Sequence, residues 1–277
     1  MDFSVLMSVY RNTKIDELEQ CLVSLYEQTV KSNEIVIVID GPINEELNSY
    51  LYSQQKEHNE IKICPIEKNV GLGNALKFGL ENCSNELVAR MDTDDICKLD
   101  RFEKQLNCFK EDDDLDVVGS NIKEFIGDVS NLVAERQVPL THDEIRKFMR
   151  VRDAFNHMSI MFKKSAIEKA GGYLPWHLNE DSYLWARLYL TDAKFKNLEE
   201  ALVFARVGED MYARRGGYKY FKSEKGILKF KLKNKIIGWF TYVKQICIRF
   251  TVQVLMTNGM RSWFYKKFAR KQIKKEK

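Results

Sequence analysis

Three acids stand close together in the segment ARMDTDD, as Asp92, Asp94 and Asp95. Carboxylates at this spacing repel one another, and a hard divalent cation with oxygen ligands would offset the repulsion. Mg²⁺ and Mn²⁺ take one or two protein carboxylates and complete their coordination shells with phosphate oxygens and water. The segment therefore indicates a cation site that also binds a diphosphate, although a single Asp-x-Asp is more often a solvated acidic turn.

A second acidic pair, Glu180-Asp181, precedes the segment SYLWARLYL, in which Leu184 and Leu188 share one face of a predicted helix. A carboxylate at this position could take a proton from an attacking hydroxyl group. The alternative is an acidic first turn that interacts with the helix dipole and has no catalytic role. The pair alone favours the structural interpretation, and together with the acidic cluster it favours catalysis.

Two further segments have both a chemical and a structural interpretation. Arg214 and Arg215 precede two glycines, and guanidinium groups beside a closely approaching backbone suit a phosphate. A solvated turn is the alternative there. His157, in FNHMSIMF, leads into a predicted strand, where a lone histidine is usually a structural residue. Both interpretations stay open for His157, whereas a phosphate contact is favoured for the arginines.

These side chains must be positioned by the elements around them, and the first hundred residues alternate strand and helix patterns. Buried strands are predicted at residues 3–10, 34–39, 61–66 and 86–91, with helices at 15–29, 45–56 and 72–80. This alternation, with nearly continuous apolar strands, predicts an α/β fold with a doubly wound, mostly parallel sheet. Beyond Arg101 the pattern is mixed, with strands predicted at 117–125, 132–138, 159–162 and 202–207.

The carboxyl ends of the parallel strands indicate where a ligand would bind. Right-handed crossovers bring these ends to one edge of the sheet. That edge would collect Ser8–Tyr10, Asp40, Asn69 and Asp92–Asp95. We expect Asp40 and Asp94 to line one cavity at this edge. A catalytic role for Asp181 would require its carboxylate to line the same cavity.

The distribution of charge divides the chain near Tyr220. The 277 residues contain 44 Lys and Arg against 40 Asp and Glu, a net charge of +4. Residues 225–277 contain 15 of these bases and one acid, so the rest of the chain has 29 bases and 39 acids. An acidic body with a basic, aromatic tail indicates an anionic partner for the tail, either lipid or nucleic acid. Six cysteines without a CxxC pair, and a start without a secretory pattern, predict a cytoplasmic protein.

The basic tail has the pattern of an interfacial helix. Charges interrupt residues 236–256, whereas a membrane span needs about 20 apolar residues. Thr241, Gln245, Arg249 and Gln253 recur every four residues and indicate a polar stripe on an amphipathic helix. Basic residues interleaved with Trp and Phe suit the surface of an anionic membrane. Packing against the rest of the chain is the alternative, and nucleic acid is not favoured because no known nucleic-acid-binding motif accompanies the tail.

The motifs SVxxxVY, Asp-Gly after the second strand, NxGxxxAxxxG, ARMDTDD and NEDxxLW occur in this order. In this combination they resemble the family 2 glycosyltransferases, which have the GT-A fold, over residues 3–215. More narrowly, they are similar to the bacterial branch that builds O-antigens, capsules and exopolysaccharides. Many relatives have two acids before the glycine that follows the second strand, and the first of these positions is Ile39 here. Leu99 replaces a common proline. Neither departure removes a predicted ligand.

For the nucleotide-sugar, the resemblance implies contacts along the edge of the sheet. Asp40 would bind the uracil edge, with Ser8 and Tyr10 beside it in the base pocket. Asn69 and Gly71 would form the loop and helix start near the nucleotide.

For the metal and the reaction, the resemblance implies roles for both acidic segments. Asp92 would approach the ribose or a metal-bound water. Asp94 would coordinate Mn²⁺ or Mg²⁺, and whether Asp94 or Asp95 is the main ligand stays open. Asp181 would be the general base, and Glu180 would contact the acceptor or orient the site.

The implied reaction is the inverting transfer of glucose or galactose from a UDP-sugar to an N-acetylhexosamine carried on undecaprenyl diphosphate. His157 would lie near the diphosphate and the acceptor. A basic loop with Arg214 and Arg215 would close over the diphosphate of the donor or of the acceptor. The enzyme would work as a peripheral protein on the cytoplasmic face of the bacterial inner membrane.

The resemblance also implies a division of the chain. Residues 1–220 would form the catalytic domain, with a nucleotide-binding half at 1–100 and an acceptor-binding half at 101–220. Residues 221–277 would form a basic, amphipathic, helical extension that associates with the membrane.

Two other functional classes are alternatives to a glycosyltransferase. A nucleotidyltransferase also combines a doubly wound sheet with metal-binding acids, but it usually has a Gly-rich loop after the first strand, and SVYRNTK has no glycine. A non-catalytic protein that binds lipid or nucleic acid through the tail would leave the ordered acids unexplained.

Overall fold

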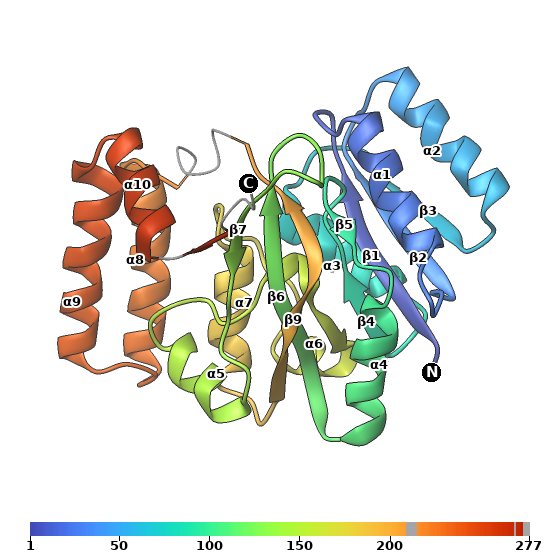
Figure 1. Ribbon diagram of the computed structural model, residues 1–277. Coiled ribbons are helices and arrows are strands. Elements are labelled where there is room, and N and C mark those ends of the chain that lie inside the picture. Colours follow the sequence, from blue (N-terminus) through green and yellow to red (C-terminus); the bar gives the residue numbers. More distant parts are fainter. Residues whose placement is uncertain (209–214, 269, 274–277) are drawn as a thin grey trace.

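Four parallel strands form one half of the sheet in the computed structural model, which describes residues 1–208, 215–268 and 270–273 (Figure 1). Their spatial order is β3-β2-β1-β4. The elements of this half are β1 (Phe3–Val9), α1 (Ile15–Tyr26), β2 (Glu34–Asp40), α2 (Glu45–Glu57), β3 (Ile61–Ile66), α3 (Leu72–Asn82) and β4 (Leu87–Arg90). The predicted alternation of strands and helices is confirmed here.

The strands of this half are apolar throughout because helices cover both faces of the sheet. Neighbouring side chains of β1, such as Val5 and Leu6, belong to two separate hydrophobic cores. Leu18 of α1 packs in the first core, and Leu76 of α3 packs in the second. With both faces covered, the carboxyl edge of the strands is where side chains can meet a ligand.

The second half of the sheet mixes strand directions. Strand β8 (Met161–Lys163) pairs antiparallel with β4 and with β6 (Leu115–Phe125), and β6 pairs parallel with β9 (Lys194–Arg206). Strand β7 (Leu132–Arg136) pairs antiparallel with β6. The remaining elements are β5 (Ile96–Cys97), α4 (Arg101–Glu111), α5 (His142–Met149), the 3₁₀ turn η1 (His157–Ser159), α6 (Lys164–Lys169) and α7 (Glu180–Leu188).

Several predicted strand boundaries in this half are wrong, among them the starts of β6, β8 and β9 and the end of β7. Strand β9 begins at Lys194 rather than at residue 202, because its polar first residues form a strand only through their pairing with β6. Ser159 lies in η1 rather than in a strand, and the pairing of β8 with β4 begins at Met161. The differences in β8 and β9 come from contacts between segments that are distant in sequence.

The tail forms a helical layer beside the sheet (Figure 1). It contains α8 (Tyr218–Lys233), α9 (Trp239–Phe250), a π-helical turn (Thr251–Leu255), α10 (Asn258–Phe268) and β10 (Lys271–Gln272). Strand β10 pairs antiparallel with β7, so the chain returns to the edge of the sheet. Leu228 and Ile237 pack against Tyr189, and the guanidinium of Arg150 donates to the carbonyl of Ile236. The tail therefore packs on the rest of the chain through α8, the turn after α8 and β10.

The polar stripe of α9 faces the protein. Gln253 is 1% exposed, and Arg249 forms an ion pair with Glu224 of α8. Large apolar side chains face solvent instead, with Trp239 64% and Phe240 90% exposed. Tyr242 and Ile246 of the same helix pack against the cluster that contains Leu228, so α9 presents apolar side chains both to the protein and to solvent. Among the described residues, no helix is both long and apolar enough to cross a membrane.

Candidate active site

A cavity of about 650 Å³ opens at the carboxyl ends of the parallel strands. Its walls include all eight residues that the sequence assigned to the nucleotide-sugar and the metal: Ser8, Tyr10, Asp40, Asn69, Gly71, Asp92, Asp94 and Asp95. We call this space the donor cavity. The strand ends thus bring together side chains from four separate segments, as the parallel topology predicts.

Asp40 fixes the loop that forms one wall of the donor cavity. Its carboxylate accepts hydrogen bonds from the backbone N–H groups of Val70 and Gly71, at 2.7 and 3.1 Å, and from the amide of Asn69 at 3.0 Å. Gly41 must be glycine, because φ is +82° and a Cβ would lie 2.3 Å from the backbone nitrogen of Asn69. A carboxylate has about four acceptor positions, so one can still receive a ligand N–H.

The three acids of residues 92–95 form a compact cluster. One carboxylate oxygen from each of Asp92, Asp94 and Asp95 lies within 4.8 Å of the others. Burial and the charge of Asp92 raise the pKa of Asp94 to about 6, and burial raises the pKa of Asp95 well above its ordinary value. The second carboxylate oxygen of Asp95 is buried and has no hydrogen-bond partner among the described residues. These oxygen donors fit Mg²⁺ or Mn²⁺, whose charge would stabilise the ionised acids.

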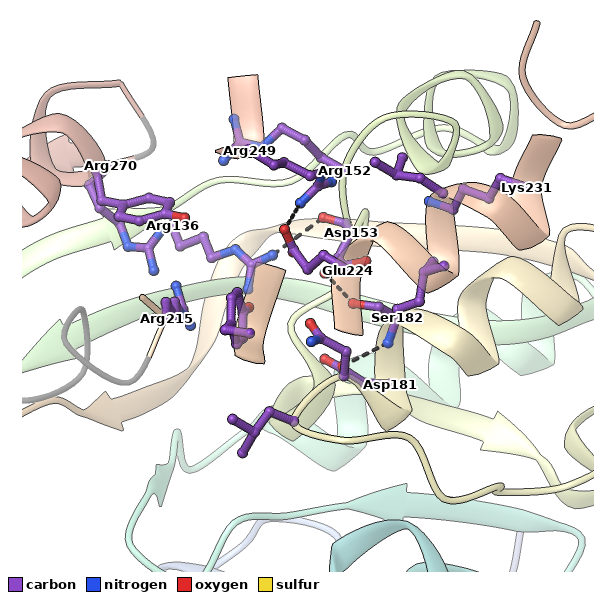
Figure 2. A pocket seen from close by; sticks show the side chains of 16 residues that line it. Arg136, Arg152, Asp153, Asp181, Ser182, Arg215, Glu224, Lys231, Arg249 and Arg270 are labelled. Carbon is purple, nitrogen blue, oxygen red and sulfur yellow. Dashed lines mark hydrogen bonds and ion pairs between the residues drawn. The ribbon is translucent and has the colours of Figure 1, made fainter. Parts of the chain in front are cut away.

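A second, narrower cavity of about 200 Å³ adjoins the donor cavity and has Asp181 in its wall (Figure 2). Arg136, Leu178, Arg215 and Arg270 line both spaces. The expectation of one cavity for Asp40, Asp94 and Asp181 is therefore wrong. The two cavities adjoin through these four shared residues, an arrangement that the strand ends alone could not predict.

Asp181 lies in an environment that favours its neutral form. Burial raises the pKa of its carboxyl to about 7, and the negative charges of Asp153 and Glu180 act in the same direction. The backbone N–H of Ser182, at 2.6 Å, and the charge of Arg136 oppose the shift. A carboxyl with a pKa near 7 can accept a proton at neutral pH and release it again.

The sequence itself identifies the chain. The family model described as "Glycosyl transferase family 2" matches residues 4–169, more than half of the chain. The chain belongs to glycosyltransferase family 2. The predicted resemblance is confirmed, and a nucleotidyltransferase or a non-catalytic binding protein is set aside.

Two curated relatives match this glycosyltransferase over nearly its whole length. The amylovoran biosynthesis glycosyltransferase AmsE of Erwinia amylovora is 38% identical over 96% of this chain and 98% of its own. A protein of Escherichia coli named UDP-Gal:alpha-D-GlcNAc-diphosphoundecaprenol beta-1,3-galactosyltransferase is 35% identical over 97% of both chains.

Solved structures show the same fold. TarS of S. aureus, residues 1–349, in complex with UDP-GlcNAc, superposes with a TM-score of 0.66 over 91% of this chain and 73% of that chain. The sequence identity is 17%, so this likeness concerns the fold alone. The GT-A fold predicted for the glycosyltransferase is confirmed.

Two arginines that sequence reasoning gave no role position the acidic cluster of the glycosyltransferase. Arg90 is 2% exposed and forms an ion pair with Asp92. Arg206 donates its backbone N–H to Asp95 at 2.8 Å and its side chain to the carbonyl of Asp94 at 3.0 Å. The place of Arg90 in ARMDTDD could have indicated its role, whereas Arg206 reaches the cluster only through β9.

The remaining predicted residues have different positions. His157 is buried, its ring nitrogen lies 2.9 Å from the hydroxyl of Tyr173, and burial lowers its pKa well below the ordinary value. His157 is not among the described residues that line the two cavities. Glu180 packs beside Gly73 at the start of α3. Arg215 lines both cavities, and Arg214 lies outside the described residues.

Proposed function

We propose that this glycosyltransferase moves glucose or galactose from a UDP-sugar, with inversion, to an N-acetylhexosamine on undecaprenyl diphosphate during assembly of a polysaccharide repeat unit. The observation that carries the proposal is the pair of adjoining cavities, one with Asp40 and the acidic cluster and one with Asp181. The names of the Erwinia and Escherichia relatives, at 38% and 35% identity, support the substrate class.

The donor cavity would bind the UDP-sugar. Asp40 and its loop would receive the uracil, with Ser8 and Tyr10 beside the base. Asp94 and Asp95 would coordinate Mn²⁺ or Mg²⁺, and Asp92, fixed by its ion pair with Arg90, would face the ribose or a metal-bound water. The bound cation would neutralise charge on the departing UDP.

Asp181 would act as the general base. An acceptor hydroxyl attacks the anomeric carbon on the side opposite the UDP, and Asp181 takes the proton as the new C–O bond forms and the C–O bond to UDP breaks. This single displacement inverts the anomeric configuration. Glu180 is not among the described residues that line the two cavities, and from beside the start of α3 it would orient the site. Arg215 would contact a diphosphate from either cavity.

His157 would support the site through its contacts with neighbouring side chains and would not touch the substrate. It bonds to Tyr173 and packs edge-on against Trp185 of α7, the helix that begins with Glu180 and Asp181. A neutral imidazole in this position keeps the start of α7 in place without adding charge.

The exposed side of α9 would rest on an anionic membrane. Trp239 and Phe240 present apolar surface to solvent, and Lys235 and Lys244 stand nearby in the sequence and are exposed. Aromatic side chains insert into the interface while lysines bind anionic headgroups. Such a contact would bring the enzyme to a lipid-linked acceptor, on the cytoplasmic face of the inner membrane.

A direct assay tests the proposal. Purified full-length protein with Mn²⁺ is incubated with a panel of UDP-sugars and with GlcNAc- or GalNAc-diphospho-lipid acceptors. We expect one UDP-hexose to be transferred, with inversion, and the reaction to stop when EDTA removes the cation. Absence of transfer from every UDP-sugar would contradict the proposed function.

A further inference from the structure

The second cavity is built by both parts of the chain and is strongly basic. The body contributes Arg136 and Arg152, the tail contributes Lys231, Arg249 and Arg270, and Arg215 stands between them (Figure 2). Against these six cations the wall contains three acids: Asp153, Asp181 and Glu224. Arg270 also forms a buried ion pair with Glu124, which lies outside this cavity, so the five other cations and the three acids leave a formal balance of +2.

The acids of the wall already have partners within the protein. Glu224 forms an ion pair with Arg249 and accepts a hydrogen bond from Gln253. Asp153 accepts a hydrogen bond of 2.7 Å from the hydroxyl of Ser182. Two of the cations donate to neutral groups instead. Lys231 donates to the carbonyl of Met149 at 2.6 Å, and Arg136 to the carbonyl of Asp153 at 3.3 Å.

The crowding of like charge has a cost that an anion would remove. Burial lowers the pKa of Arg136 to about 10, and the neighbouring charges of Arg270 and Arg215 add to the shift. Burial lowers the pKa of Lys231 to about 8. Guanidinium groups bind phosphate oxygens in pairs, so a ligand with several phosphate oxygens suits this wall.

The position of Asp181 indicates which phosphate the cavity receives. The acceptor hydroxyl must lie at Asp181, and the anomeric carbon of the acceptor sugar, which carries the diphosphate, lies across the sugar ring from it. Asp181 lines the second cavity together with Arg152, Lys231 and Arg249, which line that cavity alone, whereas the acidic cluster that fits the donor's diphosphate–metal group lines only the donor cavity. We propose that the second cavity binds the diphosphate of the lipid-linked acceptor, with the tail supplying Lys231 to the site. This inference rests on the proposed function and adds the place of the acceptor.

The test compares three probes on full-length protein saturated with UDP and Mn²⁺: decyl GlcNAc, GlcNAc-phospho-decanol and GlcNAc-diphospho-decanol. Calorimetry gives the affinity of each probe. We expect the wild type to prefer the diphosphate over the neutral glycoside. Arg152→Met should reduce that preference by about tenfold, which corresponds to the loss of one charge-assisted hydrogen bond.

Arg146→Met is the matched control for Arg152→Met. Arg152 stacks over the ring of Phe148 and Arg146 over the ring of Tyr189, so each variant loses a charge and a similar packing contact. Only Arg152 lines the second cavity. For the tail, Lys231→Met is compared with Lys229→Met, an exposed lysine of the same helix.

Three results would contradict the inference, and a fourth would contradict the proposed function alone. The inference is wrong if Arg152→Met weakens the neutral glycoside as much as the diphosphate, or if the Arg146 control gives the same loss. It is also wrong if UDP–Mn²⁺ binding weakens equally, since the cavity would then serve the donor. If the wild type transfers no UDP-sugar but Arg152→Met still removes the diphosphate preference, the proposed function fails and the anion site stands.

Discussion

The two cavities differ in charge and in origin. The donor cavity has acids at the carboxyl ends of neighbouring strands, and these acids come from short segments within the first hundred residues. The second cavity has cations from β7, α8, α9 and the segment before β10, which are distant in sequence. The acidic wall suits a divalent cation and the basic wall suits a phosphate anion. In the proposed function the acidic cluster would bind the activated sugar and the cations would bind the acceptor, with Arg136, Arg215 and Arg270 lining both cavities.

The largest effect is expected from the removal of the proposed base, which should leave UDP–Mn²⁺ binding in the donor cavity unchanged. Asp181→Asn should reduce transfer by about 10³-fold, because general bases contribute roughly 10²- to 10⁴-fold. UDP–Mn²⁺ affinity, measured by calorimetry, should change little, since Asp181 lies outside the donor cavity. Asp192→Asn, at an exposed acid, is the control. Transfer that survives in the Asp181 variant would show that the base lies elsewhere.

Asp94→Ala, in contrast to Asp181→Asn, should weaken binding of the donor. Loss of a metal ligand is expected to weaken Mn²⁺-dependent UDP binding by on the order of 100-fold, while the affinity for the diphosphate probe stays near that of the wild type. Wild-type protein in EDTA should reproduce the defect. If acceptor binding fell equally in the variant, the two cavities would not act separately.

The pH dependence tests the surroundings of Asp181. Because the pKa of this carboxyl is raised to about 7, the base is protonated at lower pH. We expect kcat/KM to rise about tenfold per pH unit below 7 and to level off above it. Asp153→Asn removes a negative neighbour, so the pKa of Asp181 should fall and the rising limb should move to lower pH. A limb that stays in place would contradict the proposed coupling.

The smallest expected effect concerns the exposed side of α9. The double change Trp239→Ser and Phe240→Ser should reduce binding to phosphatidylglycerol vesicles by about tenfold, from the loss of buried aromatic area in the interface. Transfer to a water-soluble acceptor should be unchanged. Leu190→Ser, at a 48% exposed position on the body, is the control. Equal vesicle binding by all three proteins would locate membrane contact elsewhere.

Much of the donor side was predictable because its information is local. The apolar runs of β1 and β2, the Asp40-Gly41 turn and the 92–95 cluster can each be found in a short window. The rule that parallel strands end at one edge then brings these windows together. The positions of Ser8, Asp40 and Asp94 around one cavity follow from that rule.

The acceptor side was predictable only in part. Asp181 was identified from its motif, but its separate cavity depends on how α7, α8 and β7 pack. The four-residue spacing of the polar side chains predicted the polar stripe of α9 and the π-helical turn after it. This spacing does not determine which side of the helix faces the protein. Arg249 and Gln253 turn inward because Glu224 of α8 offers them a partner.

The sequence by itself determined the family, the alternation of strands and helices in the first half and the acids that meet at the strand ends, because each depends on short-range pattern and on the handedness of the chain. Only the tertiary structure showed that Arg136, Lys231 and Arg249 line the same cavity as Asp181. Their meeting depends on long-range packing between the tail and the body, and no local periodicity encodes a contact between segments so far apart in the sequence.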